Sequence, residues 1–450
     1  MKKFLLLPIF AVLTGSNMTI SAQDVANVKL FSFTVAPEAV GKTTYIKVSA
    51  TDGQQVQVDW GNGQKSEATK LANYDDAGWV FTQIDGEIKG TDIVVYGSAT
   101  ETINYVDLSY ETAKPIEAKL LTLDVSPLNG TVSEFGASGN LLKSLDLSAN
   151  KKFVTVTLGS NALTSLTLPE NSTIKSIDVS NTDASGSKGT NQVAYADWSK
   201  LSALTTLKMN YNKSDKVLDL DFSPLAGLTT VNANECNIKT INVSKNAKLK
   251  TLNLTGNALI TLDASVMPAK SIIFANNNQL TSIKAPKGMT RLNISGNALS
   301  FATLPLVSDL GITNANNYVY APQKELAVEV NANKVDLSAQ AKAGDNETTF
   351  AWTAAGEAFT GFNATNGVFT FTQSANELVC TMTNETFPKL TLTTSPVNVN
   401  VQTSAIDDIE ADNAGMPVEY YNMQGVKVSG NEPGLYIRRQ GDKTSKVIVK

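Results

Sequence analysis

The chain has 450 residues, a formal net charge of −5, two cysteines and no histidine. The acidic balance and the lack of a dense Lys/Arg cluster argue against a nucleic-acid-binding protein. Without imidazole, Ser-His-Asp and Cys-His nucleophile systems and HExxH zinc sites are excluded. Only catalysis by a carboxylate pair, by Ser-Lys or by Lys remains open. We expect a protein that is not an enzyme and that has no catalytic residue, no cofactor and no metal site.

The first residues have the layout of a secretory signal peptide, which we expect to span residues 1–22. Two lysines precede an apolar run from Phe4 to Leu13, and the small residues Ser21-Ala22 are typical of a cleavage site. The apolar run is too short for a membrane-spanning helix. We expect the mature chain to be exported and soluble.

Residues 23–101 are predicted to form a small β-module. Segments such as TTYIKVSA and QVQVDWGNG alternate apolar with polar residues, as half-buried strands do. The turn VDWGNG resembles the DWGDG-type turn of PKD-like modules. Asp59 and Asn62 in this turn are candidate cation ligands, but a tight turn after an edge strand is the simpler interpretation.

An apolar-x-apolar step recurs along residues 102–315, mostly every ten or eleven residues. In LKTLNLTGNALITL, Leu252 and Leu254 share one strand face, and Asn257 follows where the backbone must turn. Two steps make a coil of about 21 residues, a length typical of leucine-rich repeats. Such a coil cannot bury its own apolar face, so the pattern predicts a stacked solenoid. The steps begin at Leu145, Val156, Leu166, Ile177, Leu207, Leu218, Val231, Ile241, Leu252, Leu262, Ile273, Ile283 and Leu292.

Asparagines recur three residues after the second apolar strand position, where a buried amide can bond the open backbone groups of neighbouring coils in a ladder. Cys236 takes the equivalent position in its coil. We expect it and Cys380 to be buried and not joined by a disulfide. The ladder asparagines are Asn140, Asn161, Asn212, Asn257, Asn278 and Asn297.

Two coils depart from the regular pattern. The segment from Thr182 to Thr206 is longer than its neighbours, and its YADWSKLSALTT predicts a short helical turn, as does FSPLAGLTT at Phe222 to Thr230. At the start of the repeats, Ile103 to Leu108 is predicted to be the strand that caps the solenoid.

After the repeats the pattern changes to short alternating strands. Their spacing over residues 316–401 predicts an immunoglobulin-like β-sandwich with Trp352 and Cys380 in its core. Residues 402–415 are polar and predict a linker. Residues 416–450 contain three strand segments joined by glycine turns, with many basic side chains.

The LxxLxLxxNxL coils resemble the secreted leucine-rich-repeat surface proteins of Bacteroidetes-type bacteria, with repeats similar to those of internalins. The ending YYNMQGVKV…PGLYIRRQGDKTSKVIVK resembles the C-terminal sorting domain of type IX (Por) secretion substrates. This second resemblance implies that residues 416–450 are an export signal. It also implies that the protein is secreted or associated with the outer cell surface.

On the outward side of the repeat strands most residues are small and polar, and Ile272 and Phe274 are the exception. Exposed apolar groups with a polar rim are typical of a protein-binding hot spot. In the alternative register, shifted by one residue, Phe274 would turn inward. The predicted ligand-binding residues are Ile272, Phe274, Asn253, Arg291, Asn293 and Asn232.

Asp219 and Asp221 lie on one strand face and are a candidate carboxylate pair for calcium or glycoside hydrolysis. Both chemistries need a cleft, which we do not expect on the outer face of a solenoid, so solvated side chains are the preferred interpretation.

The sequence thus predicts a mainly β protein, with a leucine-rich-repeat solenoid flanked by an N-terminal β-module and a C-terminal immunoglobulin-like β-sandwich. We expect a monomer that uses the concave face of the solenoid for recognition of, or adhesion to, an extracellular protein of a host or neighbouring cell. The alternative is a carbohydrate-binding or polysaccharide-capture surface protein.

Overall fold

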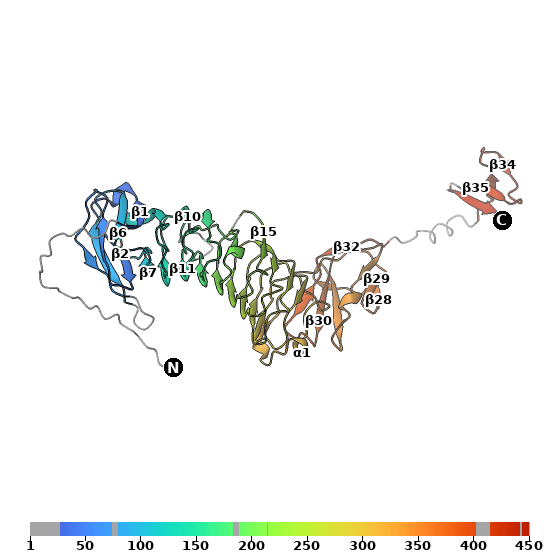
Figure 1. Cartoon of the computed structure of the whole chain (residues 1–450). Coiled ribbons are helices and arrows are strands. Elements are labelled where there is room, and N and C mark those ends of the chain that lie inside the picture. Colours follow the sequence, from blue (N-terminus) through green and yellow to red (C-terminus); the bar gives the residue numbers. More distant parts are fainter. Residues whose placement is uncertain are drawn as a thin grey trace. The chain divides into compact units, whose positions relative to one another are not determined.

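The computed structural model describes residues 28–73, 80–182, 189–213, 215–401, 415–441 and 443–449. The predicted signal peptide and all but one residue of the predicted linker lie outside these ranges. The chain divides into two compact units, both mainly β (Figure 1). The first unit contains Met1–Ala327, Ala339–Phe350 and Thr381–Ser395, and the second contains Val328–Ser338, Ala351–Cys380 and Pro396–Lys450.

The N-terminal strands of the first unit form one complete sheet and extend a second one. The complete sheet has the order β4-β3-β6-β1-β8, and the pair β2-β5 continues the long sheet of the repeats. Within β2 the side chains of Ile46 and Val48 are buried, in alternation with outward-facing residues. The strands are β1 (Val28–Val35), β2 (Thr43–Ala50), β3 (Gln55–Asp59), β4 (Thr69–Lys70), β5 (Thr82–Glu87), β6 (Asp92–Gly97) and β8 (Leu120–Asp124).

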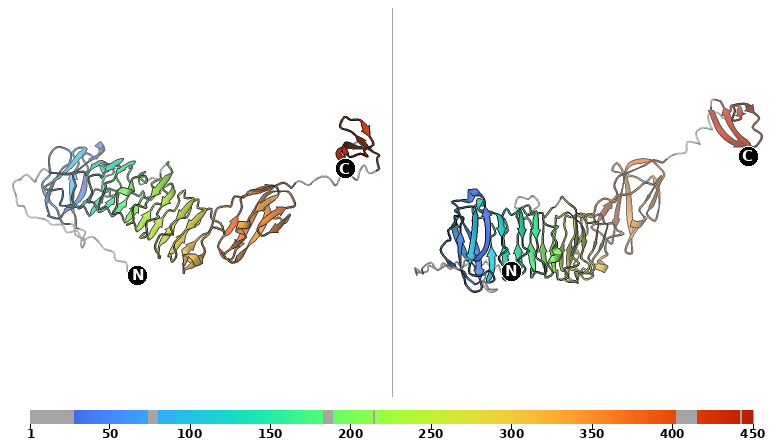
Figure 2. Two further views of the ribbon diagram at one scale, coloured as in Figure 1. Left: turned by 45° about the vertical axis from the view of Figure 1, so that its right-hand side comes forward. Right: turned by 45° about the horizontal axis from the view of Figure 1, so that its top comes forward.

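The repeats form the predicted solenoid, with coils stacked in sequence order (Figures 1 and 2). Each coil contributes one strand to a parallel sheet, which we call the main sheet. Strand β7 (Ile103–Asp107) pairs in parallel with the first repeat strand and antiparallel with β2, so the prediction of a capping strand is confirmed. The others are β9 (Glu134–Gly136), β11 (Thr155–Thr157), β13 (Ser176–Asp178), β14 (Thr206–Lys208), β16 (Thr230–Asn232), β18 (Thr251–Asn253), β20 (Ile272–Phe274), β22 (Arg291–Asn293) and β23 (Tyr318–Val319).

A second set of short strands follows the main sheet half a coil later, and we call it the second row. It is divided into the separate pairs β10-β12, β15-β17 and β19-β21. In β15 the register pairs Leu220, and not Leu218, with the inward-facing, half-buried Ile241, after an irregularity between Leu218 and Asp219. The strands are β10 (Ser144–Asp146), β12 (Ser165–Thr167), β15 (Leu218–Asp221), β17 (Ile238–Asn242), β19 (Thr261–Asp263) and β21 (Ser282–Lys284).

The asparagine ladder is confirmed. The Asn278 amide donates to the carbonyls of Leu254 and Ala275, at 2.9 and 3.1 Å, and accepts from the N–H of Leu259 at 3.0 Å. Each bond satisfies a backbone group that the turn between strands leaves open. Two rungs escape the sequence pattern, at Asn191 after the long insertion and at Gln323 beyond the last asparagine.

Helical structure is short. The predicted helical turn around YADWSKLSALTT contains the 3₁₀ helix η3 (Trp198–Lys200). The helical prediction for Phe222 to Thr230 is wrong, because that stretch forms successive hydrogen-bonded turns instead. The other helices are η1 (Pro37–Ala39), η2 (Ile116–Ala118), α1 (Val307–Leu310), η4 (Ala315–Asn317) and η5 (Ser338–Gln340). In the described residues, no helix has the length and apolar character needed to cross a bilayer.

After the repeats the chain forms two further sheets, β24-β29-β28 and β25-β26-β30-β31, and the four-stranded C-terminal sheet β34-β33-β35-β36. In the second unit the Trp352 ring is buried and lies 5.3 Å from Phe369 and 5.1 Å from Phe371, and Cys380 is also buried. The strands are β24 (Lys334–Asp336), β25 (Lys342–Ala343), β26 (Asn346–Ala354), β27 (Glu357–Ala358), β28 (Phe362–Thr365), β29 (Val368–Phe371), β30 (Ala375–Asn384), β31 (Thr391–Thr393), β32 (Val397–Val399), β33 (Val418–Tyr421), β34 (Lys427–Val428), β35 (Gly434–Gln440) and β36 (Lys443–Val449).

Candidate binding surface

The structure places the six predicted ligand-binding residues on the outward face of adjacent main-sheet strands. Ile273 is fully buried and pairs with Leu252 on one side and Leu292 on the other. Because side chains alternate along a strand, its neighbours Ile272 and Phe274 face outward and are half-buried. The register in which Phe274 would turn inward is therefore not the one that forms.

Phe274 has its polar neighbours in direct register. Its strand position pairs with Asn253 and Asn293, and the position of Ile272 pairs with Arg291. The Arg291 guanidinium lies over the Phe274 ring, 5.2 Å from its centroid. A cation–π contact of this kind stabilises an exposed pair by about 0.5–1 kcal/mol. The guanidinium and the ring thus form one composite surface.

The flanking asparagines are held by their own turns. Asn253 accepts the N–H of Thr255, and Asn293 accepts both the N–H and the hydroxyl of Ser295. These bonds use the amide oxygen, so the amide nitrogen is the group that each side chain presents outward. Asn232 lies beside Asn253 in register. We call Ile272, Phe274, Arg291, Asn253, Asn293 and Asn232 the main-sheet patch.

Asp59, the candidate cation ligand of the N-terminal turn, is used by the backbone. One carboxylate oxygen accepts the N–H groups of Gly61, Asn62 and Gly63, at 2.9 to 3.1 Å. The simpler interpretation of a tight turn accounts for this residue. Across the described part of the chain, no group of three or more His, Cys, Asp or Glu side chains is placed to hold a metal ion.

Asp219 and Asp221 are exposed on one face of β15, as expected, but the expectation that no cleft exists there is wrong. They line a groove with about 380 Å³ of space, together with the turn at Tyr195–Ser199. The groove forms because the coil before β15 has the η3 turn where its neighbours have a second-row strand. Its chemistry is treated separately below.

Asp221 also has a local role that recurs along the second row. Its carboxylate accepts the N–H of Ser223 at 2.8 Å, and Asp146, Asn242 and Asp263 make the same bond to the residue two positions later. This is an Asx-turn, which closes the strand end. The signal was present in the sequence as a repeated D/N-x-S.

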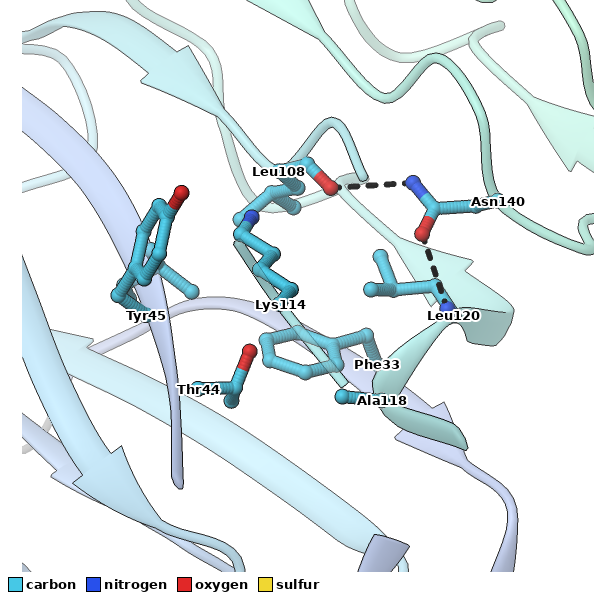
Figure 3. A pocket seen from close by; sticks show the side chains of 9 residues that line it. Phe33, Thr44, Tyr45, Leu108, Lys114, Ala118, Leu120 and Asn140 are labelled. Carbon is cyan, nitrogen blue, oxygen red and sulfur yellow. Dashed lines mark hydrogen bonds between the residues drawn. The ribbon is translucent and has the colours of Figure 1, made fainter. Parts of the chain in front are cut away.

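Sequence reasoning missed a cluster of charged and aromatic groups where β2 meets the loop after β7. The Glu111 carboxylate accepts from Lys47 and, at 2.9 Å, from the Tyr45 hydroxyl. Lys114 donates to the carbonyl of Ser109 at 2.6 Å and lies 4.4 Å from the Tyr45 ring centroid (Figure 3). No local pattern could reveal it, because the partners lie more than 60 positions apart.

Electrostatics in this cluster follow burial. Burial lowers the pKa of Lys114 to about 8, and burial together with Glu111 raises the pKa of Tyr45 to about 12. The adjoining cavity holds only about 10 Å³, room for a single water. Asn140 closes it by bridging Leu108 and Leu120 (Figure 3). We interpret the cluster as a structural anchor of the solenoid cap.

Neither Cys236 nor Cys380 forms a disulfide, and both are buried, as predicted. The thiol of Cys236 donates to the carbonyl of Met209 at 2.9 Å and so takes the place of a ladder amide. Burial raises the pKa of each thiol to about 12. Neither thiol is therefore a reactive nucleophile at neutral pH.

The fold is thus a leucine-rich-repeat solenoid, defined by its own coil length and asparagine ladder. No protein-family model matches the chain. No curated protein matches it either. Among solved structures, the functional domain of InlJ from Listeria monocytogenes, described as including a cysteine ladder, matches with 16% identity over 69% of this chain and 94% of that one, at a TM-score of 0.27. We draw nothing about function from so loose a superposition.

Proposed function

We propose that this chain is an exported, non-enzymatic cell-surface protein that recognises another protein through the main-sheet patch. The observation that carries the proposal is the Phe274 ring under the Arg291 guanidinium, set among outward amides on a hydrogen-bonded sheet. Aromatic and arginine side chains dominate the binding energy of protein interfaces. An arginine already held by its ring loses less conformational freedom on binding.

The sheet beneath the main-sheet patch is hydrogen-bonded from coil to coil, and this supports recognition of a folded partner protein. Asn278 and Asn297, which follow β20 and β22 in the ladder, are fully bonded, and Ile273 and Leu292 are buried in the core. Side chains on such a sheet keep a fixed spacing, so that little ordering is needed on binding.

A second candidate function, binding of a carbohydrate, rests on the row of outward amides at Asn232, Asn253 and Asn293. Amide nitrogens donate to sugar hydroxyls, and one aromatic ring can stack on a pyranose. The patch offers Phe274 alone for stacking, and Arg291 covers it. For this reason we place protein recognition first.

The location of the protein is also part of the proposal. It rests on the signal-peptide layout of residues 1–22 and on the resemblance of residues 416–450 to a type IX sorting domain. Expression of the chain with and without residues 416–450 in a bacterium with type IX secretion, followed by cell fractionation, tests it. Equal amounts of both forms outside the cell would contradict a sorting role.

The binding proposal is tested with the full chain on arrays of extracellular-matrix proteins and of glycans. For a protein hit, we expect Phe274→Ala and Arg291→Ala each to weaken binding by about 10-fold or more. Thr157→Ala, on the same sheet face in a coil far from the patch, is the control. A protein hit that is insensitive to both patch variants would contradict the site, and hits confined to glycans would favour the second function.

A further inference from the structure

The groove beside β15 is a second surface with its own chemistry, and it lies in the second row instead of the main sheet. Its floor is formed by Trp198, Leu218, Leu220 and Phe222, which are all buried. The volume of about 380 Å³ falls within the usual range for ligand sites. An apolar floor with polar groups at the rim is the common arrangement of such sites.

Tyr195 forms one wall. It is 54% exposed, and its hydroxyl donates to the carbonyl of Thr164. This bond fixes the position of the ring while leaving much of it in solvent. A large exposed aromatic side chain held in place has no role in the core, but it offers a face to a ligand.

Asp219 departs from the residue type of its row. The outward position before the inward-facing apolar residue is Ser144, Ser165, Thr240, Thr261 or Ser282 in the other second-row strands. Only small hydroxyl side chains occupy it there, so neither the fold nor the Asx-turn requires a carboxylate. The Asp219 side chain accepts the Thr240 hydroxyl at 2.5 Å through one oxygen.

The rim of the groove is uniformly acidic. Asp197, Asp219 and Asp221 line it, and no lysine or arginine in the described part of the chain does. Asp197 accepts the Ser199 hydroxyl through one oxygen, which leaves its other oxygen for a ligand. The hydrogen bonds of its Asx-turn and then the charge of Lys245 lower the pKa of Asp221, so this lysine offsets part of the aspartate's charge. Asp197 and Asp219 are then the carboxylates that a bound cation would pair with, whereas a neutral sugar would leave both without a counter-charge.

We propose that this groove binds an arginine or lysine side chain presented by an extended basic peptide segment of a partner protein. The guanidinium or ammonium group lies against the Tyr195 ring and donates charge-assisted hydrogen bonds to the carboxylates of Asp197 and Asp219. Cation–π contact and carboxylate pairing act together at such a site. The site is independent of the main-sheet patch, so either can fail without the other.

The test uses the full chain and the capped peptide Gly-Arg-Gly-Arg-Gly, with its glutamate counterpart, in a calorimetric titration at low and physiological ionic strength. We expect only the arginine peptide to bind. We expect Asp219→Ser and Tyr195→Ala each to weaken it by about 3- to 10-fold. Asp219→Ser introduces the residue type found in the other second-row strands, so the fold is retained.

Asp146→Asn is the matched control, because it removes one charge from the same row outside the groove and keeps the Asx-turn acceptor. Its affinity for the arginine peptide should stay within twofold of the unmodified chain. Equal weakening by Asp146→Asn and Asp219→Ser would overturn the proposal, since it would show only a long-range charge effect. Absence of arginine-peptide binding, or Tyr195-dependent binding of cellopentaose in its place, would also overturn it.

Discussion

The two strand rows of the solenoid are tied together differently. In the main sheet, Asn278 bonds backbone groups through both its nitrogen and its oxygen. In the second row, Asn246 donates to the carbonyls of Phe222 and Leu225, while its own oxygen has no partner in the described structure. The main sheet runs unbroken from β7 to β23, whereas the second row is divided into pairs. The continuous sheet is therefore the one whose asparagine bonds the backbone through both the nitrogen and the oxygen of its amide.

This difference explains where the chain tolerates irregularity. The coil between Ile177 and Leu207 is longer than the others, yet both residues remain paired in the main sheet. Asn191 restores the ladder in this coil, and the η3 turn takes the place of a second-row strand. The main-sheet patch thus lies on the continuous main sheet, and the groove lies in the divided second row.

The largest effect is expected from breaking the ladder. Asn278→Ala would leave the buried N–H of Leu259 without a partner. It would also remove one of the two bonds that each of the carbonyls of Leu254 and Ala275 accepts, the other coming in each case from another ladder asparagine. The unpaired N–H costs about 1–3 kcal/mol and each lost bond about 1 kcal/mol, so we expect the free energy of unfolding to fall by about 4 kcal/mol. Urea denaturation of the full chain measures it.

Asn246→Ala is the matched second-row variant. It removes two donated bonds but also an amide oxygen that is already unpaired. We expect a loss of about 2 kcal/mol, half that of Asn278→Ala. If the two variants lost equal stability, the proposed difference between the rows would be wrong.

A slightly smaller effect is expected from the core of the patch. Ile273→Ala removes a fully buried side chain and should cost about 3 kcal/mol. Phe274→Ala, one position away, should cost about 1 kcal/mol, because its ring is half-exposed and touches Arg291. Thermal unfolding of the two variants compares them. A larger loss for Phe274→Ala would mean that this ring is part of the core.

Much of this architecture was accessible from the sequence because it depends on short-range periodicity. The alternation around Ile273 fixes which side chains face inward, and the interval from Leu254 to Asn257 fixes a ladder rung. Where the interval was interrupted, prediction failed. Asn191 was missed because an insertion moved it out of the pattern, and Leu218 was chosen in place of Leu220 because an irregularity in β15 shifts the register.

The candidate sites divide in the same way. The main-sheet patch was predictable, since outward residues of successive coils lie side by side. The groove was not predictable. Tyr195 and Asp219 line it together because the η3 turn takes the place of a second-row strand in the coil before β15. The Lys114 cluster depends on Tyr45 and Lys47 of another strand, which no periodic pattern connects to it.

A titratable rung gives the next prediction. Burial raises the pKa of the Cys236 thiol from 9.0 to about 12, so the native state holds its proton after the unfolded state has lost it. Stability due to this group is complete below pH 9 and is lost as the pH rises toward 12, by about 1.4 kcal/mol per pH unit. Urea denaturation between pH 8 and pH 11 measures this slope.

Cys236→Ser is the control, because serine can donate to the carbonyl of Met209 without titrating in this range. Its stability should fall less steeply with pH than that of the unmodified chain. Cys380 is present in both proteins and cancels in the comparison. Identical slopes would show that the ladder thiol does not carry a raised pKa.

The smallest expected effect is a loss of stability at acid pH that comes from the second row and not from the main sheet. Hydrogen bonds from Ser223 and Ser265 lower the pKa of Asp221 and of Asp263, respectively, below 3.8. A lowered native pKa adds stability above the unfolded value, and that stability is lost as the pH falls through the native one. Main-sheet amides do not titrate, so the loss belongs to the second row. We expect the melting temperature to fall by about 2 °C between pH 5 and pH 3 from these two groups, since both are exposed.

Asn242 shows how to isolate this effect, because it makes the same Asx-turn with an amide oxygen. In Asp221→Asn/Asp263→Asn the turns are kept and the two titrating groups are gone, so the acid loss should shrink while the melting temperature at pH 7 stays nearly constant. If the melting temperature of this variant fell between pH 5 and pH 3 as much as that of the unmodified chain, the acid-sensitive groups would lie elsewhere. A variant that is much less stable at pH 7 would mean that the charge itself, and not the turn acceptor, closes the second-row strands.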